Sequence, residues 1–139
     1  DDIYVIEDRV TGICREDHDI RLYYNFAFGH LDGENGKFDY TSQKGRGYTM
    51  TVQADKKLDF EILEGSENPI DGWISYGYAW RKPIPQLIAK HSGKAPIHFI
   101  TVLAPEGTKA ETAINGDAAM VTLAGGKVLT LTENAVELH

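Results

Sequence analysis

The segment 72–85 concentrates the side chains with the clearest capacity for chemistry. It holds four aromatic residues within eight positions, Trp73, Tyr76, Tyr78 and Trp80. Two cations, Arg81 and Lys82, follow directly. An aromatic ring can stack on the apolar C–H face of a sugar, while Arg and Lys can bind a carboxylate or sulfate, Arg in bidentate fashion. The side chains predicted to bind such a ligand are Tyr78, Trp80, Arg81 and Lys82.

Two other interpretations of this segment stay open. Large rings are usually buried, and core packing is the prediction for Trp73 and Tyr76. Exposed clusters of rings and cations also form interfaces with other proteins.

No motif for catalysis or metal binding accompanies these residues. The five histidines have no zinc-type spacing, and HExxH, GxSxG, Walker and EF-hand patterns are absent. His98 alternates with two apolar neighbours, so we expect it to face solvent. The sequence therefore predicts no catalytic residue, no metal ligand and no cofactor.

Composition narrows the class of protein. A chain of 139 residues fits one domain, and its net charge of −7 is unsuited to nucleic acid. No apolar run reaches the length of roughly 18 residues that a membrane helix needs. Cys14 is the single cysteine, so no internal disulfide forms, and we expect it to pack as a small apolar side chain. The first residues read as a strand, so we expect the chain to start inside a longer protein.

The apolar residues recur with a period of two, as in β-strands. Segment 18–28 is the clearest case, with one face formed by Ile20, Leu22, Tyr24, Phe26 and Phe28. Similar strands recur every eight to twelve residues, and no segment has a helical period. The prediction is an all-β, antiparallel β-sandwich of two packed sheets with little or no helix.

Several connections are predicted as well. The glycine-rich segment 29–36 is expected to be a loop. Segments 86–90 and 96–103 are expected to pair as a hairpin. The pattern places residues 1–139 in a single domain, in which 108–139 form a hairpin-like tail around Gly125 and Gly126.

Four blocks in order resemble the C-terminal β-sandwich region of the heparinase II/III-like polysaccharide lyases. They are residues 4–12, His18 at the head of a long strand, Gly72-Trp73-Ile74-Ser75 with Tyr76-Gly77, and residues 99–105. The resemblance covers roughly residues 3–107. Where that family often has a second histidine in the strand after His18, this chain has Asn25.

The resemblance implies a parent protein that cleaves uronic-acid polysaccharides by β-elimination. It also implies an upstream helical toroid domain as partner, an acidic polysaccharide as substrate, and a periplasmic or secreted location. The family's catalytic and metal-binding residues lie upstream of this region, so none is transferred. The role that follows is support of the catalytic cleft, with possible glycan contacts at its rim. The alternative is an autonomous carbohydrate-binding or interaction module without catalysis.

Overall fold

A computed structural model of the chain describes residues 2–13 and 15–139. Cys14, for which an apolar packing role was predicted, lies outside the described residues. The described residues form sixteen β-strands and no helix, and all paired strands are antiparallel. This confirms the predicted all-β sandwich class. Within the same ranges no helix is long and apolar enough to cross a membrane.

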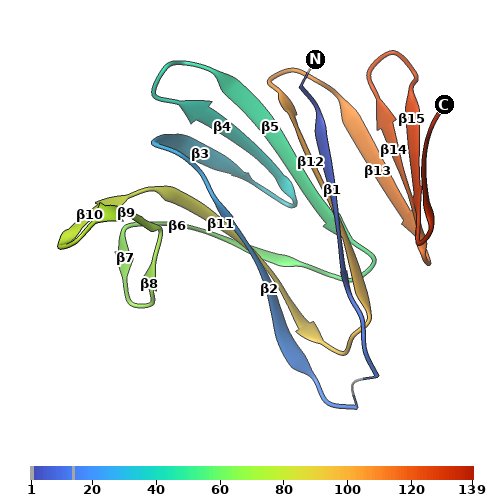
Figure 1. Cartoon of the computed structure of the whole chain (residues 1–139), viewed down its shortest axis with the longest axis horizontal. Helices are drawn as coiled ribbons and strands as arrows, with labels where there is room; N and C mark the ends of the chain where they lie inside the picture. The colour runs from blue at the N-terminus through green and yellow to red at the C-terminus, as the bar shows by residue number, and fades with distance from the viewer. Residues whose placement is uncertain (1, 14) are drawn as a thin grey trace.

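Two sheets form the main body (Figure 1). The five-stranded sheet has the order β1 (Tyr4–Val10), β12 (Ile97–Pro105), β5 (Gly47–Ala54), β4 (Lys37–Ser42) and β3 (Gly29–Glu34). The three-stranded sheet has the order β2 (His18–Asn25), β11 (Pro85–Gly93) and β6 (Asp59–Glu64).

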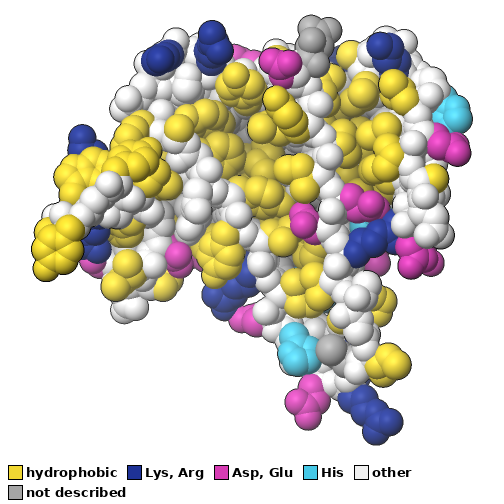
Figure 2. Space-filling model, in the orientation of Figure 1, with side chains coloured by type: hydrophobic (Ala, Val, Ile, Leu, Met, Phe, Trp, Pro, Cys, Tyr) yellow, Lys and Arg dark blue, Asp and Glu magenta, His cyan; other side chains and the backbone are white. Residues whose placement is uncertain are grey.

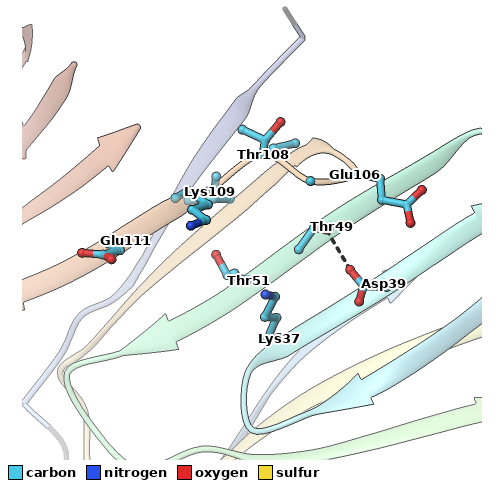
Figure 3. Close-up of a pocket in the computed structure, with 12 residues that line it drawn as sticks. Lys37, Asp39, Thr49, Thr51, Glu106, Thr108, Lys109 and Glu111 are labelled. Carbon is cyan, nitrogen blue, oxygen red and sulfur yellow. Dashed lines mark hydrogen bonds between the residues drawn. The ribbon is translucent and has the colours of Figure 1, made fainter. Parts of the chain in front are cut away.

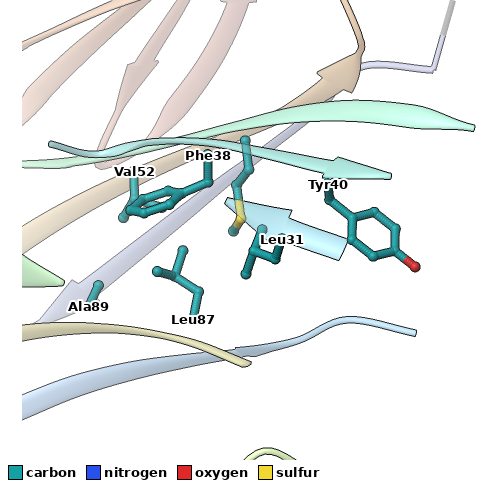
Figure 4. Close-up of a cluster of buried hydrophobic side chains, with 7 residues drawn as sticks. Leu31, Phe38, Tyr40, Val52, Leu87 and Ala89 are labelled. Atoms are coloured by element: carbon teal, nitrogen blue, oxygen red, sulfur yellow. The ribbon is translucent and has the colours of Figure 1, made fainter. Parts of the chain in front are cut away.

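The first core fills the space between these two sheets (Figure 4). Its fully buried members are Leu31, Phe38, Tyr40, Met50, Val52, Leu87 and Ala89. The last two come from β11, and the others come from β3, β4 and β5. Leu22 and Tyr24 of the predicted apolar face pack against this cluster, which confirms the register predicted for that strand.

A four-stranded sheet forms a third layer, visible at the right of Figure 1. Its strands are β13 (Ala110–Asn115), β14 (Ala118–Leu123), β15 (Val128–Thr132) and β16 (Ala135–Leu138). The predicted hairpin exists as β14 and β15, but the segment 108–139 has four strands rather than two. Its apolar face packs on the outer face of β12 in a second core of Ile100, Val102, Ala119, Val121 and Leu131.

The loop predicted at 29–36 is wrong, because β3 occupies Gly29–Glu34 and only Asn35 and Gly36 form the turn. Glycine in β3 reflects crowding between strands, not a loop. A Cβ at Gly29 would collide with the Thr41 carbonyl, and one at Gly33 would collide with the Lys37 carbonyl. Glycine permits this close approach of two backbones.

The hairpin predicted between segments 86–90 and 96–103 is also wrong. β11 pairs with β2 and β6, whereas β12 pairs with β1 and β5, so the chain crosses from one layer to the other. Both strands are central in their sheets and nearly continuously buried. Both edges of β11 and both edges of β12 are hydrogen-bonded to other strands, so neither strand has a free edge for the other.

His98 does not face solvent as predicted, since only 5% of it is exposed. It lies on the face of β12 that the four-stranded sheet covers. Its Nε2 atom is 2.7 Å from Glu7 Oε1, and Arg9 Nη2 donates to the same oxygen at 2.7 Å. Arg9 Nη2 also donates to the Asp117 carbonyl at 2.7 Å, which links β1 to the turn between β13 and β14.

One polar contact bridges the two sheets of the main body. The Tyr24 hydroxyl in β2 lies 2.6 Å from Thr101 Oγ1 in β12. Burial raises the pKa of the Tyr24 phenol above its usual value, an effect that the hydrogen bond with Thr101 opposes and the nearby Asp8 charge reinforces.

The raised pKa of Tyr24 predicts a loss of stability in alkali. Above about pH 10 the unfolded chain releases this proton while the folded chain keeps it. The unfolded state then binds fewer protons, so the free energy of unfolding falls as the pH rises, until the pH passes the pKa in the folded state. Urea unfolding of the native chain and of Tyr24→Phe across this range measures the effect. We expect a shallower decline for Tyr24→Phe, and equal slopes would contradict the assignment.

Candidate functional site

The segment with the predicted binding residues forms a β-hairpin at the left end of the molecule in Figure 1. Its strands are β9 (Trp73–Gly77) and β10 (Trp80–Pro83), and we call residues 73–83 the aromatic hairpin. Tyr78 and Ala79 form the turn, where Ala79 has a φ of 56°. A short second hairpin, β7 (Ser66–Glu67) and β8 (Ile70–Asp71), lies beside it in sequence and in Figure 1.

One side of the aromatic hairpin carries a ring cluster with a cation. The Tyr76 and Trp80 ring centroids are 5.3 Å apart, with the planes inclined by 31°. Lys82 Nζ lies 5.6 Å from the Trp80 centroid and 5.9 Å from that of Phe28. Tyr76 is 73% exposed and Trp80 36%, so both rings keep surface that a ligand can contact. Figure 2 shows hydrophobic side chains gathered at this end.

The opposite side anchors the aromatic hairpin to its neighbours. The Arg81 guanidinium lies 4.1 Å from the Trp73 ring centroid, and Arg81 Nη2 forms an ion pair with Glu67 at 2.7 Å. Trp73 Nε1 donates a hydrogen bond to the Ser66 carbonyl at 2.8 Å. The Arg81 charge is thus partly neutralised, and its main contacts hold β7 against the aromatic hairpin.

A cleft of about 260 Å³ opens at the base of the aromatic hairpin. Phe28, Gln43, Glu64 and Lys82 supply its larger side chains, with Gly29, Pro83 and Pro85 completing the lining. Lys82 therefore connects the ring cluster to this cleft. An apolar ring, a cation, an amide and a carboxylate in one opening can contact the C–H face, the acidic group and the hydroxyls of a sugar.

The structure brings together only some of the predicted binding residues. Trp80 and Lys82 are adjacent, Tyr78 is fully exposed at the tip, and Arg81 lies on the other side with Glu67. The prediction that Tyr76 packs in the core is wrong, because no layer covers this hairpin; Trp73 is half-buried. Sequence reasoning missed Tyr76 as an exposed ring, and spacing could not have shown it, because the turn at Tyr78 and Ala79 interrupts the alternation of the strand.

Phe28 was also missed, since it was assigned to the apolar face of the preceding strand. That strand ends at Asn25, and Phe28 lies in the connection to β3. Among residues 2–13 and 15–139, no group of three or more His, Cys, Asp and Glu side chains is placed to hold a metal ion.

The fold and the exposed hairpin can now be set beside known proteins. The sequence matches no protein-family model, and no curated protein matches it. The structure is similar to a solved structure of heparinase III, with a TM-score of 0.72 and 16% sequence identity. The match covers 94% of this chain and 22% of that chain.

This likeness defines the class of the molecule as an all-β domain with a heparinase-like fold. The resemblance seen in the sequence is confirmed at the level of the fold. The likeness extends over 94% of the chain and therefore includes most of segment 108–139, to which the sequence resemblance did not reach.

Proposed function

We propose that this chain is the C-terminal β-sandwich domain of a heparinase II/III-like polysaccharide lyase. In this proposal the longer protein cleaves a uronic-acid polysaccharide by β-elimination, and an upstream helical toroid domain supplies the catalytic groups. The domain supports the catalytic cleft, and the aromatic hairpin contributes a glycan contact at the rim of that cleft. The observation that carries the proposal is the fold likeness to heparinase III over 94% of this chain.

The aromatic hairpin supports the binding part of the proposal. Tyr76 and Trp80 form an exposed pair of rings in contact, and Lys82 places a positive charge over the Trp80 ring. Exposed aromatic rings leave apolar surface in contact with water, so a partner that covers this pair gains free energy by burying it. A sugar with an acidic group matches both the ring faces and the ammonium group.

The alternative function is an autonomous carbohydrate-binding or interaction module without catalysis. The observation that favours it is the protrusion of the aromatic hairpin from the main body, where it can contact a partner unaided (Figure 1). A lyase domain with a rim contact and an autonomous carbohydrate-binding module both predict glycan binding, and they differ in whether a lyase domain accompanies the chain. A pure interaction module predicts no glycan binding.

Two measurements on the same samples test the proposal. The ultraviolet absorbance of unsaturated products reports β-elimination on a panel of uronate polymers, and affinity electrophoresis reports binding. We expect this chain to bind at least one polymer and to release no unsaturated product, whereas the complete protein should release it. Turnover by this chain alone would contradict the upstream location of the catalytic groups. Absence of product from the complete protein would favour the alternative.

A further inference from the structure

We propose that a cleft between the five-stranded and four-stranded sheets is a second sugar-binding site. It has a volume of about 630 Å³, within the range of small-molecule sites (Figure 3). The ligand class is a sugar residue that carries one anionic group, either a carboxylate or a sulfate. The proposal rests on the proposed glycan-binding function and adds a contact separate from the aromatic hairpin.

The floor of the cleft is the outer face of three neighbouring strands. The register places residues of β4, β5 and β12 in two rows, Lys37–Thr51–Val102 and Asp39–Thr49–Ala104. Each row therefore has a charged group, a hydroxyl and an apolar side chain in that order. A sugar ring has the same mixture of features, since its hydroxyls are polar and its C–H face is apolar.

Two lysines face each other across the cleft. Lys37 comes from β4, and Lys109 comes from the connection that leads into β13. Figure 3 shows both side chains directed toward the Thr51 hydroxyl. Among residues 2–13 and 15–139, no carboxylate lies within 4.0 Å of either ammonium group. An anionic group between them would gain charge-assisted hydrogen bonds from both lysines.

The carboxylates of the cleft limit the charge of the ligand. Asp39 accepts a hydrogen bond of 2.7 Å from Thr49 Oγ1, and Glu106 and Glu111 lie toward the two ends (Figure 3). These acceptors suit the hydroxyls of a sugar. They also repel further negative charge, so a ligand with several sulfates is disfavoured. One anionic group flanked by hydroxyls is the chemistry that satisfies both sets of residues.

An amide NMR titration of the full chain tests the site with three probes: methyl glucuronide, a sulfated methyl glucoside and neutral methyl glucoside. We expect the Lys37, Thr51 and Lys109 amides to shift with a charged probe, at a Kd on the order of 1 mM. The tighter of the two charged probes identifies carboxylate or sulfate as the natural group. Equal binding of the neutral probe, or no shift at these amides, would overturn the proposal.

Variants separate this site from general charge effects and from the aromatic hairpin. Lys37→Gln with Lys109→Gln should weaken binding at least about tenfold, whereas Lys94→Gln with Lys127→Gln, which removes two exposed lysines elsewhere, should not. Unchanged binding by the first pair would overturn the proposal. Trp80→Ala should leave the cleft shifts intact. If the chain fails to bind polymers at the hairpin while these shifts persist, only the hairpin function fails.

Discussion

Replacing Trp80 by alanine is expected to lower the affinity of the chain for an acidic polysaccharide by about thirtyfold, as aromatic hot-spot residues do. The substitution removes the larger ring of the exposed Tyr76–Trp80 pair. The same ring is closer to Lys82 than the Phe28 ring is. Affinity electrophoresis in gels with graded amounts of polymer gives the dissociation constant. Folding should be retained, because the aromatic hairpin lies outside both cores.

Tyr23→Ala is the matched control for this experiment. Tyr23 is a 46% exposed aromatic residue on β2, in the three-stranded sheet and outside the aromatic hairpin. We expect its affinity to equal that of the native chain. If Trp80→Ala and Tyr23→Ala migrate alike, the exposed rings have no specific role and the rim contact is withdrawn.

Phe38→Ala should have the largest effect on stability, with a loss of about 3–5 kcal/mol in the free energy of unfolding. Phe38 is 1% exposed, and its ring centroid lies 5.2 Å from that of Phe60 across the first core. Without the ring, the contact with Phe60 is absent and a cavity remains between the five-stranded and three-stranded sheets. Such a loss is a large fraction of the 5–15 kcal/mol typical of a domain.

Urea unfolding monitored by tryptophan fluorescence measures this loss. Met120→Ala is the control, because Met120 is 43% exposed on the outer face of the four-stranded sheet. We expect that variant to remain within about 0.5 kcal/mol of the native chain. A Phe38→Ala midpoint as high as that of Met120→Ala would show that the ring is not a principal contact of the first core.

The local patterns of the chain predicted many of its strands but missed β3. Alternation along Ile20, Leu22 and Tyr24 fixed both the strand and the face that it buries, because a period of two has only two faces. The pairing of the strands was harder to predict. Segments 86–90 and 96–103 were wrongly predicted to form a hairpin. Alternation is the same whether β12 turns back beside β11 or crosses to the opposite layer, so the sequence pattern does not distinguish the two.

The stacking of distant parts of the chain explains the remaining errors. His98 looks like a solvent-facing histidine only if nothing covers that side of β12. Tyr76 looks like a core residue only if something covers the aromatic hairpin. Both predictions depended on how distant parts of the chain are stacked, which no local pattern reports. The cleft between the five-stranded and four-stranded sheets was missed for the same reason, since Lys37 and Lys109 are far apart in sequence.

Burial of β12 on both faces has a thermodynamic consequence. Ile100 and Val102 belong to the second core. Thr101 and Leu103, on the opposite face of β12, contact residues of the first core. Unfolding of β12 would therefore disrupt both cores together. The three layers are thus expected to melt cooperatively in a single transition.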